Sequence, residues 1–324
     1  MLPAAVSAEA TAVALGAALR DAYGADARLE DWIAQPLTKR GKQRVVRYDI
    51  GACVGRGIPA RRFQWVGKYY DRDDEAARVA TVLRALAATD CGARGAVVIP
   101  GLVAYHAALR LLVVTYEAGA SVISAIAQHH EPALEAIGRA LAALHATPVP
   151  LDTTTPPAVV VGQLRSKITE LRALLPGETV SLPRLLLKLE REASSWPAGQ
   201  AFLHGDCGPA QLLWQDGRIV VLDFDRCTRG DPALDLGNLL TQLRRLTLRK
   251  PGKLPPFTAV RAGLLDAYRR WSGRDPGLER RVAWYEEATL VRKIHSLALD
   301  TPHHLDTEAQ QRRAEAVRLL ECVA

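Results

Sequence analysis

The chain has 324 residues, of which 48% are hydrophobic and 24% charged, a composition typical of a globular protein with a large core and two lobes. No run approaches the roughly 18 uninterrupted apolar residues of a membrane helix, and the first segment carries an early acid instead of a basic leader, so we expect a soluble, cytoplasmic protein that makes no membrane contact. The formal net charge of +7 favours an anionic partner.

The first part of the chain has the pattern of a small lobe of strands. An Ala-rich segment at 7–23 has apolar residues at helical spacing and ends at Gly24. Segments with strand character follow at 28–36, 43–50, 62–70, 95–106 and 108–117. A helix is expected at about 73–88, between the third and fourth strands. These segments predict a five-stranded antiparallel sheet with one inserted helix.

From residue 117 onward the pattern changes to helices. Apolar residues recur at helical spacing in 121–130, 132–146, 161–175, 181–193, 234–248, 257–272, 277–299 and 307–323. A strand pair at 211–214 and 218–222 interrupts them, and Gln215-Asp216-Gly217 between the strands is a hairpin signal. We therefore expect an α+β protein with an N-terminal lobe at 1–116 and a mostly helical C-terminal lobe at 117–324.

The cysteines and the basic residues limit the compartment and the partners. The five cysteines lie far apart without metal-type spacing, which indicates neither a disulfide framework nor a zinc site and fits a reducing cytoplasm. The densest basic segment, 244–253, contains no aromatic residue that would stack on bases. We therefore expect no nucleic-acid partner, and the sequence does not predict the oligomeric state.

Carboxylates stand beside the strands of the central third. Asp206 follows an apolar stretch on a loop, and Asp223 directly follows the strand that ends at Leu222. Because the turn at Gly217 folds the hairpin back, we expect Asp206, Gln211 and Asp223 to converge. Such oxygen-bearing side chains suit Mg²⁺, which shares its hard ligands with phosphate. A remaining carboxylate can orient a substrate hydroxyl and accept its proton.

The segments His204-Gly205-Asp206 and Asp223-Phe224-Asp225, with Gln211 between them and GDPALDLGNLL at 230–240 after them, resemble a known catalytic core. It is that of the aminoglycoside phosphotransferase and choline kinase superfamily, whose fold is protein-kinase-like. The resemblance covers most of the chain and is most specific in the central third. The family has Asn where this chain has Gln211, a departure that resembles the maltokinase variant.

The resemblance implies an ATP-dependent phosphotransferase that moves the γ-phosphate to a hydroxyl of a small molecule. The acceptor would be a sugar, an amino-sugar or an aminoglycoside-like compound, with a sugar-type alcohol preferred. Asp206 would be the catalytic base. The Mg²⁺ ligands would be Gln211 and Asp223, with Asp225 as an auxiliary metal residue. His204 and Asp235 would hold the catalytic loop through hydrogen bonds.

A kinase-like fold also requires a lysine on the third strand, and Lys68 ends the segment at 62–70. On the following helix, Glu75 projects at about 100° per residue onto the apolar stripe of Val79 and Leu83. A carboxylate on a buried face needs a cation, because its burial is otherwise costly. We therefore expect Glu75 to pair with Lys68 at the nucleotide phosphates.

Two further segments resemble nucleotide-binding elements of the superfamily. The loop at 38–42 occupies the first hairpin, where Lys39 and Arg40 would donate to the phosphates, although a plain basic turn is an equal alternative. The segment at 113–119 falls at the interlobe hinge, where adenine would contact the backbone around Tyr116 and Glu117.

The late helices carry aromatic residues beside acids, a combination that suits a sugar ring or an amino group. These candidate acceptor residues, which are also ordinary residues of an amphipathic helix, are Trp271, Trp284, Tyr285, Glu286 and Glu287.

Other classes of function stay open at this stage. The unusual Gln211 and the lack of a glycine signature are compatible with an inactive or weak kinase-like regulator that binds nucleotide. A choline-type amine kinase is a further alternative within the superfamily. A metal-dependent phosphohydrolase would use Asp206, Asp223 and Asp225 around two ions, act without ATP and need no Lys68.

Overall fold

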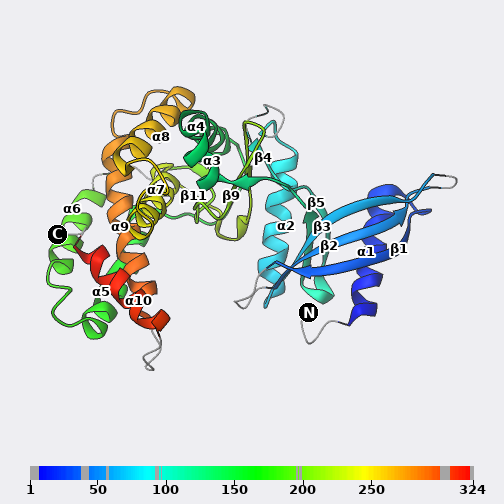
Figure 1. Cartoon of the computed structure of the whole chain (residues 1–324), viewed down its shortest axis with the longest axis horizontal. Coiled ribbons are helices and arrows are strands. Elements are labelled where there is room, and N and C mark those ends of the chain that lie inside the picture. Colours follow the sequence, from blue (N-terminus) through cyan, green and yellow to red (C-terminus); the bar gives the residue numbers. More distant parts are fainter. Residues whose placement is uncertain are drawn as a thin grey trace. The chain divides into compact units, whose positions relative to one another are not determined.

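The computed structural model describes residues 7–37, 44–55, 58–91, 95, 97–194, 196, 199–299 and 307–321. The chain forms two compact units (Figure 1). The N-terminal unit comprises Met1–Arg94, Val98–Gly119 and Val220–Asp225. The C-terminal unit comprises Gly95–Val97, Ala120–Ile219 and Arg226–Ala324. The segment Val220–Asp225 therefore returns to the N-terminal unit after about a hundred residues of the other one.

The N-terminal unit is built on the predicted five-stranded antiparallel sheet, with strand order β1-β2-β3-β6-β5. Its strands are β1 (Arg28–Pro36), β2 (Arg44–Cys53), β3 (Arg61–Tyr69), β5 (Leu102–His106) and β6 (Leu111–Thr115). Its helices are α1 (Ala8–Tyr23) and α2 (Asp73–Ala87), and α2 packs against β5 and β6. The predicted sheet with a helix inserted after the third strand is thus confirmed.

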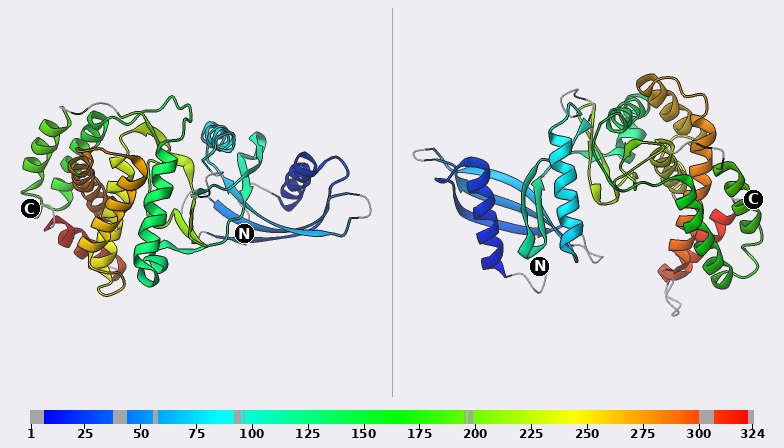
Figure 2. Two further views of the ribbon diagram at one scale, coloured as in Figure 1. Left: turned by 90° about the horizontal axis from the view of Figure 1, so that it is seen from above. Right: turned by 180° about the vertical axis from the view of Figure 1, so that it is seen from behind.

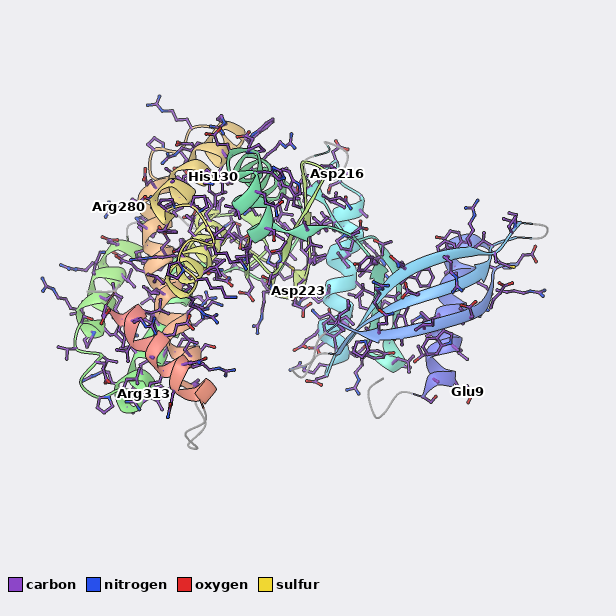
Figure 3. The ribbon with its side chains drawn as sticks, viewed as in Figure 1. Glu9, His130, Asp216, Asp223, Arg280 and Arg313 are labelled. Carbon is purple, nitrogen blue, oxygen red and sulfur yellow. The ribbon has the colours of Figure 1, made fainter. Side chains whose placement is uncertain are left out.

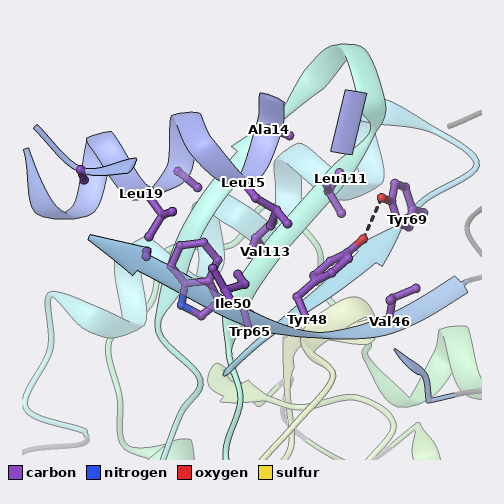
Figure 4. Close-up of a cluster of buried hydrophobic side chains, with 13 residues drawn as sticks. Ala14, Leu15, Leu19, Val46, Tyr48, Ile50, Trp65, Tyr69, Leu111 and Val113 are labelled. Atoms are coloured by element: carbon purple, nitrogen blue, oxygen red, sulfur yellow. Dashed lines mark hydrogen bonds between the residues drawn. The ribbon is translucent and has the colours of Figure 1, made fainter. Parts of the chain in front are cut away.

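The core of this unit lies between α1 and the sheet (Figure 4). Leu15 and Leu19 of α1 are fully buried against side chains that alternate along the strands, such as Tyr48 and Ile50 of β2. The Tyr48 hydroxyl forms a 2.9 Å hydrogen bond with the Tyr69 hydroxyl, so the polar end of each buried ring has a partner. Burial of this apolar face fixes the register of β3, which carries Lys68 at its end.

The C-terminal unit consists mainly of helices. They are α3 (Val122–Gln128), α4 (His130–His145), α5 (Pro157–Leu174), α6 (Leu182–Ala193), α7 (Ala233–Arg249), α8 (Phe257–Ser272), α9 (Leu278–Leu299) and α10 (Thr307–Leu320). The long helix α9 packs against α5, α7 and α10, and α4 packs against α8 (Figure 2). None of the helices in the described ranges is long and apolar enough to cross a membrane.

Short strands position the loops that carry the predicted site. Strand β8 (Ala201–Leu203) pairs with β11 (Thr228–Gly230), and β7 (Ala120–Ser121) pairs with β9 (Leu212–Gln215). The four-stranded sheet has the order β4-β10-β9-β7, with β4 at Val97–Val98 and β10 at Arg218–Val221. Asp216 and Gly217 have φ of 48° and 81°, as a two-residue hairpin turn of type I′ requires, which confirms the predicted hairpin.

Candidate active site

In the N-terminal unit, two carboxylates meet one ammonium group. Lys68 Nζ donates hydrogen bonds of 2.6 Å to Asp223 Oδ1 and of 2.6 Å to Asp225 Oδ2. The side chains of Lys68 and Asp225 are only 13% and 16% exposed, whereas that of Asp223 is 44% exposed. We call these three residues the Lys68 cluster; Asp223, which is labelled in Figure 3, is the most exposed of them.

Asp225 is anchored from two further elements of the same unit. The Tyr70 hydroxyl donates a 2.9 Å hydrogen bond to Asp225 Oδ1, and the Arg78 guanidinium on α2 donates to the Asp225 backbone carbonyl. Burial raises the pKa of the Tyr70 phenol well above its usual range, and the neighbouring charge of Asp225 acts in the same direction. Tyr70 therefore remains a donor, which fixes the Asp225 carboxylate for the ammonium of Lys68.

Asp223, two residues after the end of β10, has a left-handed backbone conformation, with φ of 67°. Such a conformation is uncommon outside glycine but is tolerated by Asp, and it is often found at functional sites. Here it turns the chain from the strand into the short 3-10 helix Phe224–Arg226. This turn lets Asp223 and Asp225 reach the same lysine.

The donor chemistry of the Lys68 cluster fits a hard divalent cation. Two carboxylates already converge on one positive charge, and Mg²⁺ takes one or two protein carboxylates with phosphate and water as further ligands. Within the described ranges no group of three or more His, Cys, Asp or Glu residues forms a complete metal cage. Two carboxylates would leave the other positions of such a cation to further ligands such as phosphate or water.

In the C-terminal unit, the residues His204–Asp206 form a rigid loop after β8, which we call the Asp206 loop. Gly205 has φ of 80°, and a Cβ at this position would stand 2.0 Å from the Arg226 carbonyl oxygen, so only glycine fits. The Asp206 amide donates a 3.3 Å hydrogen bond to Nδ1 of the buried His204. The Asp206 carboxylate is left half-buried, with no hydrogen bond or ion pair to any residue in the described ranges.

The buried Asp235 holds this loop, as the resemblance implies. Its carboxylate accepts the backbone amides of His204 at 2.7 Å and Gly205 at 2.9 Å, and it contacts His145 Nε2 at 3.2 Å. Burial acts to raise the pKa of Asp235, but the hydrogen bonds and the charge of the neighbouring histidine outweigh it, and the pKa is lowered. Asp235 therefore stays ionised and keeps the loop in one conformation.

Of the other predicted site residues, Gln211 lies in the C-terminal unit, and Tyr116 and Glu117 lie in the N-terminal unit. Gln211 is half-buried just before β9, and its backbone N–H donates to the Gly208 carbonyl at 3.0 Å. In the N-terminal unit, the Tyr116 amide donates to the Gln64 carbonyl at 3.0 Å, and Glu117 accepts a 2.7 Å hydrogen bond from Thr115. Both are half-buried and follow β6. Lys39 and Arg40 lie outside the described residues.

The prediction that Glu75 lies on the buried face and pairs with Lys68 is wrong. Glu75 is exposed in the first turn of α2, and the buried stripe of that helix begins only at Ala76. Lys68 donates instead to the Lys68 cluster carboxylates. From α2 it is Arg78, one turn further on, that reaches this region, a contact that sequence reasoning missed because its target is 147 residues away.

The aromatic residues proposed as an acceptor surface are mostly part of the core. Trp284 and Tyr285 are each 1% exposed, and the Trp284 indole donates to the Leu189 carbonyl at 3.0 Å. Glu286 and Glu287 form ion pairs with Arg261 and Lys188. Only Trp271 is largely exposed, at 53%. The expected acceptor surface of aromatic and acidic residues is therefore not formed, because these side chains stabilise helix packing.

Comparison with known proteins adds a sequence family and a set of similar folds. The sequence profile of the phosphotransferase enzyme family matches residues 56–285, which include the Lys68 cluster and the Asp206 loop. Among curated proteins, none matches the chain significantly.

Several solved structures share the fold at low identity. A macrolide 2′-phosphotransferase from Brachybacterium faecium is 22% identical, with a TM-score of 0.55 over 94% of this chain and 97% of that one. An amicoumacin kinase in complex with AMP-PNP, Ca²⁺ and Ami is 14% identical, with a TM-score of 0.63 over 89% of this chain and 88% of that one. A choline/ethanolamine kinase family protein from Mesorhizobium loti is 19% identical, with a TM-score of 0.59 over 89% and 88%. These likenesses confirm the predicted protein-kinase-like α+β fold.

Proposed function

This chain belongs to the phosphotransferase enzyme family and is a small-molecule phosphotransferase, and from that premise we propose that it moves the γ-phosphate of ATP to a hydroxyl of a sugar-type alcohol. The observation that carries the proposal is the Lys68 cluster, in which one half-buried ammonium stands 2.6 Å from each of two carboxylates. A lysine at the end of the third strand and metal-binding carboxylates are the parts that kinase-like folds use to hold nucleotide phosphates.

Lys68 and the carboxylates are assigned to the phosphates. The ammonium of Lys68 would donate to phosphate oxygens. Tyr70 and Arg78 keep the neighbouring Asp225 in position. Asp223, Asp225 and Gln211 would hold Mg²⁺, which supplies neutralisation of the phosphate charge when it is bound. The backbone around Tyr116 and Glu117 is assigned to adenine, and Lys39 and Arg40 to the phosphates. The similar fold of an amicoumacin kinase in complex with AMP-PNP and Ca²⁺ supports a nucleotide with a divalent ion.

Asp206 is assigned to the acceptor hydroxyl. Its carboxylate is half-buried on a loop that Asp235 holds rigidly, so it can orient a hydroxyl for in-line attack and accept its proton. Rigid support is needed because phosphoryl transfer depends mainly on positioning and on neutralising charge.

The reaction compartment proposed is the cytoplasm, where ATP is available. The described cysteines Cys53, Cys91, Cys207 and Cys227 are free thiols, which fits a reducing environment.

The test is ATP-dependent phosphorylation of a panel of hydroxyl compounds. Sugars, sugar acids, sugar phosphates, amino-sugars and amino-alcohols are incubated with the protein, ATP and Mg²⁺, and a mass gain of one phosphate is measured. We expect transfer to at least one compound, and its loss in Asp206→Asn with nucleotide affinity unchanged, because Asp206 acts on the acceptor. Asp216→Asn, in the exposed hairpin turn, is the matched control and should remain active.

Three results would refute the proposal. Full activity of Asp206→Asn would show that Asp206 is not the catalytic base. Nucleotide binding without transfer to any alcohol would indicate a regulator. Hydrolysis of phosphate esters without ATP, unaffected by Lys68→Met, would indicate a phosphohydrolase.

A further inference from the structure

Two cations of α9 lie beside the Asp206 loop in the C-terminal unit. Asn238 of α7 donates to the Gly205 carbonyl at 3.4 Å, and Thr289 of α9 donates to Asn238 Oδ1 at 2.6 Å, so this face of α9 is tied to the loop. Arg292 and Lys293 follow Thr289 by three and four residues, which places them on the same helix face one turn further on.

Neither cation has a direct partner among the residues that the structure describes. Arg292 and Lys293 are half-buried, and neither has a hydrogen bond or an ion pair to any residue within the ranges that the structure covers. Charged side chains at such depth are normally paired, because removing a charge from water is costly. Two unpaired cations side by side therefore indicate a place for an anion.

The acids around α9 do not compensate these charges, since other cations hold them. Glu286 pairs with Arg261 at 3.0 Å, Glu287 pairs with Lys188 at 2.7 Å, and Glu315 pairs with Arg245 at 2.7 Å. Each of these ion pairs is complete in itself, which leaves Arg292 and Lys293 in excess.

The electrostatics agree with this count of charges. Burial lowers the pKa of Arg292, and the nearby Arg226 acts in the same direction. Burial also lowers the pKa of Lys293, and so do the charges of Arg292 and Arg245. In both cases Asp206 is the one acid that favours the charged form. A single carboxylate, not in direct contact, faces at least two cations that burial destabilises.

We propose that the acceptor carries an anionic group, a carboxylate or a phosphate ester, and that Arg292 and Lys293 bind this group beside Asp206. The inference rests on the proposed function and narrows its acceptor class. An anion placed here neutralises the two cations while its hydroxyl is presented to Asp206. A polycationic acceptor such as an aminoglycoside would instead add positive charge to an existing excess.

The experiment compares matched pairs of alcohols that differ in charge. Binding of gluconate against sorbitol, and of glycerol 3-phosphate against glycerol, is measured by titration calorimetry without nucleotide, and KM values are measured wherever transfer occurs. We expect the anionic member of at least one pair to bind at least about tenfold more tightly.

Variants then assign the preference to the two cations. Arg292→Gln and Lys293→Gln should each weaken binding of the anionic compound about 10- to 100-fold while leaving its neutral counterpart and the KM for ATP unchanged. Arg280→Gln is the matched control, since Arg280 is an exposed cation of the same helix (Figure 3), and it should have no effect. Arg292→Lys, which keeps the charge, should retain most of the preference and guards against a folding defect.

The outcomes separate this inference from the proposed function. The inference would be overturned if charged and neutral alcohols bound equally, or if Arg280→Gln weakened binding of the anionic compound as much as Arg292→Gln. Phosphate transfer to neutral alcohols would still support the proposed function in that case. A raised KM for ATP with acceptor binding unchanged would overturn it too, because the cations would then serve the nucleotide phosphates. Transfer that prefers the anionic compounds supports both.

Discussion

The two charged groups of this protein are compensated in opposite ways. In the Lys68 cluster of the N-terminal unit, one half-buried cation is bonded directly to two carboxylates. Around the Asp206 loop of the C-terminal unit, one carboxylate faces cations that make no direct bond to it. In the Lys68 cluster the charged side chains are bonded to one another. The Asp206 loop is instead held through the backbone amides of His204 and Gly205.

The difference in local charge favours a different kind of ligand for each group. In the Lys68 cluster two carboxylates converge, with the Arg78 guanidinium bonded to the Asp225 carbonyl, and such carboxylates suit a metal ion with phosphates. The Asp206 region carries an excess of positive charge, which suits an anionic molecule. The residues that position each carboxylate also act differently. Tyr70 and Arg78 bond Asp225 itself, whereas Asp235 positions Asp206 through the backbone amides of His204 and Gly205.

The largest expected effect is the loss of this backbone support. Asp235→Asn should lower the free energy of unfolding by about 3 to 5 kcal/mol, because the amide leaves buried donors of the loop unpaired in place of a charged acceptor. Urea unfolding measures the change. Asp216→Asn changes the same groups in an exposed turn and should stay within about 0.5 kcal/mol. If the two variants were equally stable, the loop would not depend on Asp235.

The same residue gives a dependence on pH. The pKa of Asp235 is lowered in the folded protein, so its stabilising contribution is fully present above the unfolded pKa of about 3.9 and is lost as the pH falls through the folded value. The difference in unfolding free energy between wild type and Asp235→Asn should therefore be constant from about pH 7 to 5 and shrink below about pH 4. Unfolding at a series of pH values checks this, and a difference that grew on acidification would contradict it.

A smaller effect is expected where the loop backbone touches Arg226. Gly205→Ala combines a positive φ with a Cβ that stands 2.0 Å from a carbonyl oxygen, whereas Gly217→Ala has nearly the same φ and open space around its Cβ. Gly217→Ala should cost about 1 to 2 kcal/mol, and Gly205→Ala should cost a further 1 to 3 kcal/mol, about the range for overpacking. Only Gly205→Ala should also reduce kcat, because it displaces Asp206. Equal stability of the two variants would show that the loop shifts without cost.

The comparison also shows what the sequence can and cannot predict. Helical and strand spacing located nearly all elements, because each buries one regular face, and the Asp216-Gly217 turn was predicted because only a few residue types adopt its backbone. Strands β8 and β11 were missed, since three residues are too few to show alternation.

Some of the site residues could be predicted from the sequence and others could not. Motif spacing singled out Lys68, Asp223 and Asp225 separately, with Glu75 expected as the partner of Lys68. The structure brings the two aspartates within hydrogen-bonding distance of Lys68 instead. Glu75 was assigned wrongly because a helical projection does not show where the helix meets the sheet. Arg292 and Lys293 gave no signal in the sequence, since what sets them apart is that neither has a partner among the described residues, which only packing reveals.

The smallest expected effect concerns the second support of Asp225. Arg78→Met removes the donor to the Asp225 carbonyl but keeps the length of the side chain, and Arg84→Met makes the same change at an exposed position of the same helix. A hydrogen bond from a charged donor contributes about 1.5 to 3 kcal/mol when buried, and less at a half-buried site, so kcat/KM for ATP should fall about 3- to 10-fold in Arg78→Met. Arg84→Met should leave it unchanged. Because Tyr70 still holds the Asp225 carboxylate, the loss should stay well below that of Lys68→Met. A loss as large as that of Lys68→Met would mean that Arg78 contacts the nucleotide itself, and no loss would mean that Tyr70 alone positions Asp225.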